Sequence, residues 1–344
     1  MRKFLLAILT SLLTLSAFAQ FDSFAGFYKG EQSGTKKYPL NMSPDIYAEV
    51  YRGGDSYRLK ILADILCRGD EYCVVEGLKA ENGEIKLVDA GALKLNGKIT
   101  PEGIEATGVL YGKDPIKLSL KRYKYESPTL GAKAPAGAIV LFDGKDTSKW
   151  ELCANKQPIN WIINGDGSMT VKNDAKKPDG KPLNSSIQTK DVFGAFKLHL
   201  EFMTPGEYDK FGQARSNSGV IMGPYEVQIL DSFGDTGANN QCGSLYRQTP
   251  PQSNACLEPG AWQTYDIIYT PAKFNGKTLV AYPTFTVYLN GVRIHNETPV
   301  TYGTSMSEYM AKKNNFQHPT KGISIQLQDH TNPIKFRNIW LQAL

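Results

Sequence analysis

The sequence has 344 residues, and 39 Lys and Arg against 34 Asp and Glu give a formal net charge of +5 at pH 7. The basic residues are scattered along the chain, which does not indicate a nucleic-acid-binding surface. No apolar run after the first 15 residues approaches the ~18 residues that a spanning helix needs, so no membrane span is predicted.

The chain begins with a basic head, an apolar run from Phe4 to Leu15 and small residues up to Ala19. This pattern is typical of a secretory signal peptide. We therefore expect residues 1–19 to be removed and the mature protein to be periplasmic or extracellular.

The sequence contains five cysteines, and cysteines in an exported chain predict disulfide bonds. Cys67 is close enough in sequence to pair with Cys73, and Cys242 could pair with Cys256. Cys153 is then left over as a buried thiol. The spacing alone leaves this connectivity open.

Residues 20–125 contain many short alternating segments separated by Gly and Asn. For example, residues 47–51 and 57–62 flank Gly53-Gly54, as in a β-hairpin. The series predicts a small antiparallel β-barrel or sandwich without a catalytic constellation. Residues 126–136 are rich in Pro, Gly and Ala, which predicts an extended linker.

Residues 137–344 form the second predicted domain, and alternating strand patterns dominate it. The class is therefore all-β, an antiparallel sandwich preceded by the smaller β domain. One short helix is expected in residues 305–313. The expected strands are 138–142, two within 161–171, 196–203, two within 215–231 that are joined at Gly223-Pro224, 262–269, 285–289, 292–294, 322–329 and 334–341.

Several strands of this domain pair an apolar face with a face of Glu, Gln and His. Such a surface offers directional hydrogen bonds and few point charges, which suits a polyhydroxylated ligand. We expect these faces to line one sugar-sized hollow, with aromatic rings as platforms for sugar rings. The expected lining residues are His199, Glu201, Asn217, Glu226, Gln228, Gln326, Gln328 and His330, with Tyr246 and Trp262 as platforms.

Glu226-x-Gln228-x-x-Asp231 has the spacing of the acidic motif of laminarinase-like retaining β-glucanases. Here Gln replaces the middle acid and Asp the last one. A retaining pair needs carboxyls about 5–5.5 Å apart, and the shorter side chain disturbs that distance. The pattern therefore disfavours ordinary retaining hydrolysis.

Taken together, the motifs of residues 137–344 resemble the 3-keto-disaccharide hydrolase family. The resemblance implies a concanavalin-like jelly-roll sandwich in an exported protein that acts on glycosides oxidised at C3. The motifs that carry it are Leu141-Phe-Asp-Gly144 with Trp150, Asn217-Ser-Gly219, Tyr225-Glu-Val-Gln-Ile-Leu-Asp231, Cys242-Gly-Ser-Leu-Tyr246, Pro259-Gly-Ala-Trp-Gln-Thr-Tyr-Asp266, Leu327-Gln-Asp-His330 and Phe336-Arg-Asn-Ile-Trp340.

The implied chemistry starts from a C3 ketone, which acidifies the proton on C2. Either Glu201 or Glu226 is the expected base. His330, Arg215 or a divalent metal ion is expected to hold the enolate oxygen. If an ion is the cofactor, its expected ligands are His199, Glu226, Asp231 and His330.

Some of these charged residues could have a structural role instead of a catalytic one. Arg215 could pair with an acid, and Asp231 could cap the turn that follows it. Arg337 is expected in a structural ion pair. His295 and His318 are expected in exposed turns without a role.

Two other functions stay open. The protein could be a secreted carbohydrate-binding module without catalysis, or an ordinary endo-β-glucanase. An oligosaccharide is the expected partner in each case.

Overall fold

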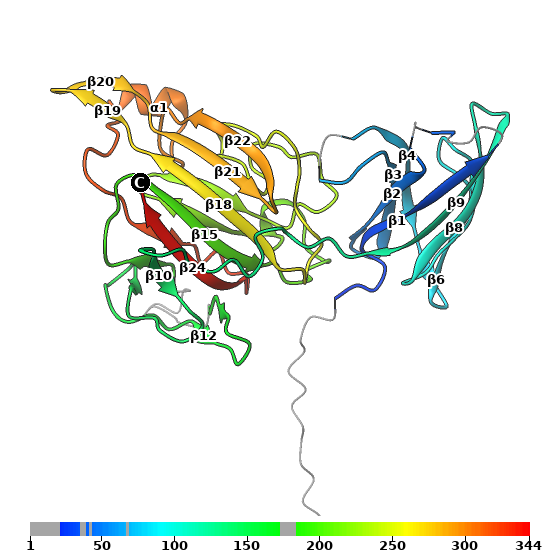
Figure 1. The fold of residues 1–344 in the computed structure, drawn as a ribbon, viewed down its shortest axis with the longest axis horizontal. Coiled ribbons are helices and arrows are strands. Elements are labelled where there is room, and N and C mark those ends of the chain that lie inside the picture. The colour runs from blue at the N-terminus through cyan, green and yellow to red at the C-terminus, as the bar shows by residue number, and fades with distance from the viewer. Residues whose placement is uncertain (1–20, 35–38, 41–42, 67–68, 173–183) are drawn as a thin grey trace, which may run out of the picture.

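The computed structural model describes residues 21–34, 39–40, 43–66, 69–172 and 184–344. Two β units make up these residues, joined by a long connection (Figure 1). The predicted signal peptide and Cys67 lie outside the described residues. Among the described residues, no helix combines the length and the apolar composition that a bilayer crossing requires.

The N-terminal unit is a nine-stranded antiparallel sheet in the order β4-β3-β2-β1-β9-β8-β7-β6-β5. The sheet curls around its own apolar core, so that Gly91, after β6, lies against Cys73 and Val74 of β4. Its strands are β1 (Gly26–Gly34), β2 (Asp45–Gly53), β3 (Ser56–Leu62), β4 (Glu71–Leu78), β5 (Ala80–Glu81), β6 (Glu84–Ala90), β7 (Leu95–Ile99), β8 (Gly103–Leu110) and β9 (Asp114–Tyr123).

The C-terminal unit contains a larger and a smaller antiparallel sheet, so the predicted all-β sandwich is confirmed. The larger sheet runs β12-β13-β24-β15-β18-β21-β22, with β10 on β24, and the smaller runs β11-β14-β23-β16-β17. The larger sheet contains β10 (Ile139–Phe142), β12 (Ile162–Ile163), β13 (Met169–Thr170), β15 (Phe196–Met203), β18 (Gln263–Thr270), β21 (Thr284–Leu289), β22 (Val292–Pro299) and β24 (Lys335–Ala343). The smaller sheet contains β11 (Trp150–Leu152), β14 (Ile187–Thr189), β16 (Ser218–Met222), β17 (Tyr225–Ile229) and β23 (Ile325–Leu327). Outside both sheets lie the hairpin β19 (Lys273–Asn275) and β20 (Thr278–Ala281), the 3-10 turn η1 (Gly212–Ala214) and the helix α1 (Glu308–Lys313).

The two sheets face each other across a shared apolar core. Leu198 and Leu200 of β15 and Val227 of β17 are buried in it. Tyr225 of the smaller sheet packs against Phe285 of the larger sheet, with ring centroids 5.8 Å apart. Because alternate residues of a strand point to opposite faces, the polar residues of β15 and β17 lie on opposite outer surfaces of the sandwich.

The connection between the two units lies against the outer face of the larger sheet. The backbone N–H of Gly131 donates to Glu201 Oε1 at 2.6 Å, and the carbonyl of Ala132 accepts from Asn338 Nδ2 and Trp340 Nε1. The connection includes a turn, in which the backbone N–H of Ala132 donates to the Thr129 carbonyl, and these hydrogen bonds hold it to the sandwich.

Apolar and charged contacts join the two units directly. Phe27 of β1 packs edge-on against Phe233, with ring centroids 5.1 Å apart. Arg215 ion-pairs with Asp231 at 2.5 Å and also donates to the Tyr51 hydroxyl of β2. Both Arg215 and Asp231 are buried, so part of the sandwich core is completed by the N-terminal unit.

The predicted disulfide between Cys242 and Cys256 is not present, because both residues are free, buried thiols. Cys256 Sγ donates to the Leu257 carbonyl at 3.5 Å, and Cys242 Sγ lies 3.3 Å from the Tyr265 hydroxyl. Cys153 is also a free thiol, and burial raises its pKa to about 11. A thiol that stays protonated at neutral pH is a poor nucleophile.

Candidate active site

A row of polar side chains crosses the outer face of the smaller sheet. The register pairs Glu151 with Gln188, Gln188 with Gln326, Gln326 with Ile221 and Ile221 with Glu226. Paired residues of neighbouring strands point to the same face. Glutamine and glutamate from β11, β14, β23 and β17 therefore share one surface, as predicted for Glu226 and Gln326.

A second row runs beside the first. Gly219 of β16 pairs with Gln228 of β17, and its carbonyl accepts from the backbone of Gln328 at 3.0 Å. A Cβ atom at Gly219 would collide with Glu226 Oε1. The missing side chain at Gly219 thus leaves the space that the Glu226 carboxylate occupies.

Glu226 is held by hydrogen bonds and is only 6% exposed. Thr304 Oγ1 donates to its Oε2 at 2.8 Å, and Gln228 Nε2, with the amide oriented to satisfy both ends, donates to its Oε1 at 3.0 Å. Burial raises the pKa of Glu226 to about 6, although the Thr304 hydrogen bond opposes the shift. A carboxylate with this pKa can accept a proton near neutral pH.

Gln213 connects the other polar groups around Glu226. Asn217 Nδ2 donates to the Gln213 carbonyl at 2.7 Å, and the Tyr246 hydroxyl lies 3.3 Å from Gln213 Oε1. Gln213 Nε2 donates in turn to the Asn240 carbonyl at 2.7 Å. Asn217 and Tyr246 therefore join Glu226 on this surface, as the sequence predicts.

Two further polar atoms on this side are buried without a hydrogen-bond partner among the described residues, Gln328 Oε1 and Ser244 Oγ. Ser244 precedes Leu245, which packs in the core and pairs with Val227. Unpaired buried polar atoms cost free energy, and a bound ligand or water can satisfy them. His330 is exposed and lies three residues beyond β23, the strand that carries Gln326.

Glu201 and His199 lie on the opposite outer surface, so the predicted single hollow is wrong for them. Arg337 Nε donates to Glu201 Oε2 at 2.6 Å, and His199 Nδ1 lies 3.0 Å from Asp266. Burial would raise the pKa of Glu201, but hydrogen bonds from His199, Asn338 and Arg337 outweigh it and lower the pKa to about 2. Such a carboxylate is a weak base, so its role is structural.

Trp262 lies on that same opposite surface, because the Arg337 guanidinium stacks 3.9 Å from its ring centroid. It is therefore not a platform beside Glu226. Arg215 is not there either, since it forms the buried ion pair with Asp231 behind the site. The structural alternative expected for Arg215 is the one observed, and Asp231 is its partner.

The four expected metal ligands do not converge. His199 is bound to Asp266 on the larger sheet, Asp231 to Arg215, and Glu226 to Thr304. Within the described part of the chain, no group of three or more His, Cys, Asp or Glu side chains could hold a metal ion. The prediction of a site built from these residues is wrong.

His295 and His318 are buried, so their predicted exposure is wrong. The strand β22 continues to Pro299 and carries His295 into the interior, where Nε2 lies 2.8 Å from the Gly243 carbonyl. His318 Nδ1 lies 2.7 Å from the Tyr225 hydroxyl. Burial lowers the pKa of both imidazoles and keeps them neutral.

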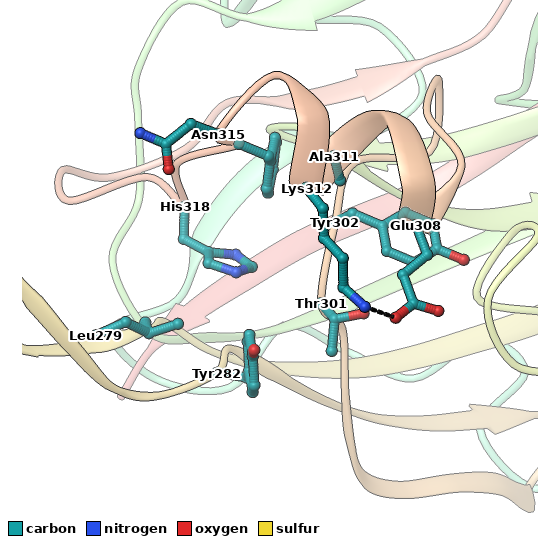
Figure 2. A pocket seen from close by; sticks show the side chains of 10 residues that line it. Leu279, Tyr282, Thr301, Tyr302, Glu308, Ala311, Lys312, Asn315 and His318 are labelled. Carbon is teal, nitrogen blue, oxygen red and sulfur yellow. Dashed lines mark ion pairs between the residues drawn. The ribbon is translucent and has the colours of Figure 1, made fainter.

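Two cavities flank Tyr302, near the segment that carries Thr304. The larger, about 520 Å³, lies between α1, Leu279 of β20 and Tyr282, which follows that strand (Figure 2). Its charged groups, Glu308 and Lys312, are exposed and paired at 2.7 Å. The smaller, about 330 Å³, is lined by Asn239, Asn240, Arg247, Tyr302, Met306 and Ser307.

Sequence reasoning missed Gln213, Thr304 and Gln188. Gln213 sits in η1 and Thr304 in a loop, where no strand or helix periodicity marks a buried face. Gln188 lies in β14, a three-residue strand that was not predicted. A polar residue inside a short apolar run, as in Ser-Ile-Gln188-Thr, is the signal that could have found it.

Comparison with known proteins identifies the family to which residues 137–342 are similar. The family model of the 3-keto-alpha-glucoside-1,2-lyase-like domain matches residues 137–342. A solved structure of a candidate glycosyl hydrolase from Parabacteroides distasonis ATCC 8503 is 38% identical over 61% of this chain and 85% of its own, with a TM-score of 0.52. Another candidate glycosyl hydrolase from that organism is 22% identical over 60% of this chain and 99% of its own, with a TM-score of 0.39. A search of the curated proteins finds no match.

Proposed function

Because the chain belongs to the family of the 3-keto-alpha-glucoside-1,2-lyase-like domain, we propose that it is an exported enzyme that cleaves 3-keto-glycosides with Glu226 as the base. Membership and the related structure support a glycoside-cleaving, carbohydrate-active protein. The observation that carries the finer proposal is the buried Glu226 carboxylate among the Glu and Gln rows, with its pKa raised to about 6.

The proposed reaction needs one base and donors for one oxyanion. Glu226 takes the proton from C2, and the electron pair of that C–H bond forms the C2=C3 enolate. When the enolate re-forms the ketone, its electron pair makes a double bond between C1 and C2. The bond between C1 and the aglycone oxygen breaks, and that oxygen keeps the bonding electrons and takes up a proton. Addition of water across C1=C2 completes net hydrolysis.

The groups around Glu226 fit these steps. Gln326 and Gln328 carry amide N–H groups that can stabilise an enolate oxygen without a formal charge, while the Gln228 amide is already bonded to Glu226. We also propose His330, which is exposed three residues beyond β23, as a further donor. The unpaired Gln328 Oε1 and Ser244 Oγ could bond to sugar hydroxyls.

Ordinary two-carboxylate hydrolysis fits less well. Glu151 and Glu226 are the carboxylates in the first row, and they sit on β11 and β17. Four strand spacings of about 4.8 Å separate these strands, which gives about 19 Å. Retaining and inverting glycosidases need about 5–5.5 Å and about 6.5–9.5 Å between the two carboxyls.

A carbohydrate-binding module without catalysis is the second candidate. The Gln-rich outer face of the smaller sheet favours it, since amides bind hydroxyl groups well. The raised pKa of Glu226 favours the enzyme, because sugar binding alone does not require a carboxylate whose pKa lies close to neutral pH.

The substrate test compares a 3-keto-disaccharide with the same disaccharide unoxidised, in deuterated water. We expect turnover of the keto form only, with deuterium at C2 of the released sugar, measured by NMR and mass spectrometry. Samples without protein correct for spontaneous exchange at C2. Equal cleavage of the unoxidised sugar would rule out the keto requirement, and product without deuterium would indicate direct displacement at C1.

The pH profile should report the ionisation of Glu226. A base must be charged, so kcat/KM should fall about tenfold per pH unit below the pKa of about 6 and level off above about pH 7. Thr304→Val removes a hydrogen bond to the charged form and should move this limb to higher pH. Thr301→Val, at an exposed neighbour, is the matched control. A limb at the ordinary Glu value of about 4.3 would contradict the assignment.

A further inference from the structure

We propose that the 330 Å³ cavity beside Tyr302 is the leaving-group subsite of this enzyme, and that Arg247 selects an acidic leaving group such as a uronic acid residue. This inference rests on the proposed function, because it assigns the second half of the same substrate.

Three walls of the cavity continue directly into the groups around Glu226. Asn240 accepts a hydrogen bond from Gln213, which contacts Asn217 and Tyr246. Arg247 follows Tyr246, and its guanidinium lies 5.6 Å from the Tyr246 ring centroid. A substrate over Glu226 can therefore extend past Tyr246 into the cavity without crossing another element.

The third wall is the segment from Tyr302 to Ser307. It carries Thr304, the hydrogen-bond donor to Glu226. Gln248 ties this segment to the Arg247 hairpin, because its Nε2 donates to the Tyr302 carbonyl at 2.9 Å and its Oε1 accepts from the backbone of Thr301 at 3.0 Å. These hydrogen bonds thus fix the position of the cavity wall relative to Glu226.

The backbone holds Arg247 in an unusual conformation. Its φ is 62°, in the left-handed region that residues other than Gly rarely adopt. The Arg247 backbone N–H donates to the Asn239 carbonyl at 2.7 Å, and its own carbonyl accepts from the Tyr302 hydroxyl at 3.4 Å. Contacts from two cavity walls therefore fix the position of this residue.

The chemistry of the lining favours an anion. Its side chains supply one cation, two amides, two hydroxyls and a thioether, and none of them is an acid. Among the described residues, Arg247 has no carboxylate partner. Glu308, the acid next to Ser307, is paired with Lys312 and lines the other cavity. A guanidinium without an acid binds a carboxylate through charge-assisted hydrogen bonds and a neutral hydroxyl more weakly.

The size of the cavity suits one sugar ring. Its volume of about 330 Å³ lies at the lower end of the range of about 300–1,000 Å³ for small-molecule sites. The Tyr302 ring and Met306 provide apolar contact, as sugar rings need on one face. The larger cavity also includes Tyr302 in its lining (Figure 2), but Asn240, the partner of Gln213, does not line it.

The test uses three 3-keto-glucosides that differ in the leaving group, namely methanol, glucose and glucuronic acid. The wild-type protein should favour the glucuronic acid substrate over the glucose substrate by about 10–100-fold in kcat/KM. Arg247→Ala should bring this ratio close to one, and Arg247→Lys should restore part of it. Tyr282→Ala, in the wall of the larger cavity, is the matched control and should leave the ratio unchanged.

Equal kcat/KM for the acidic and neutral leaving groups in the wild-type protein, or an unchanged ratio in Arg247→Ala, would overturn the assignment. A binding arm separates it from the catalytic proposal. Methyl glucuronide, followed by NMR titration, should bind the wild-type protein, bind more weakly at high salt, and fail to bind Arg247→Ala. If no keto substrate turns over but this pattern holds, the proposed reaction fails and the anionic subsite stands. Absence of methyl glucuronide binding to the wild-type protein would contradict the assignment of an anionic subsite.

Discussion

Glu226→Gln should abolish most of the turnover of a 3-keto-glycoside, with kcat reduced about 10²–10⁴-fold, the range that general-base catalysis contributes. The amide has the same shape and can keep the Thr304 contact, but it cannot accept the C2 proton. The fold should be retained, because the variant removes a carboxylate whose charge burial disfavours. Initial rates and denaturant unfolding of the same preparations measure both effects.

Glu201→Gln is the matched control, since it makes the same change on the opposite surface. Glu201 is paired with Arg337, so this variant should lose stability while each folded molecule keeps its rate. Equal losses of kcat in the two variants would argue against Glu226 as the base. A catalytically normal Glu226→Gln would remove the proposed mechanism altogether.

Asp231→Asn should lower the free energy of unfolding by roughly 3–5 kcal/mol, because it leaves the buried Arg215 guanidinium without its acid. The effect should be visible as a lower denaturant midpoint at an unchanged m-value. Tyr51→Phe removes only the hydroxyl partner of Arg215 and should cost about 1 kcal/mol.

Asp55→Asn is the control for Asp231→Asn, because Asp55 pairs with Lys79 at the surface and is fully solvated. Surface pairs contribute little, so its midpoint should stay at the wild-type value. If Asp231→Asn behaves like Asp55→Asn, the Arg215 pair does not stabilise the joint between the two units.

Strand patterns were the part of the fold that the sequence could predict. Residues 196–203 alternate cleanly and form β15 with Phe196 and Leu198 inward, as expected. Two-residue and three-residue strands such as β12 and β14 have too few positions to show an alternation. The predicted concanavalin-like connectivity remains a prediction, because periodicity does not specify strand order.

The candidate site shows why the sequence could not predict which polar side chains share a surface. Alternation places Glu201 and Glu226 on polar faces, but it cannot say which sheet each strand joins. That choice depends on partners far away in the sequence, such as Arg337 for Glu201 and Thr304 for Glu226. Both glutamates therefore look equivalent in the sequence, although Glu201 is ion-paired with Arg337 and Glu226 is the buried carboxylate that we propose as the base.

Truncation of this protein would break contacts between its two units. Gly131 and Ala132 hydrogen-bond to the larger sheet, and Tyr51 contacts Arg215. A fragment trimmed to the matched residues 137–342 would keep every group around Glu226. It would also strip the cover from Glu201 and open the apolar patch around Phe233 to water. The segment that the family model matches is thus smaller than the segment whose residues pack together in this structure.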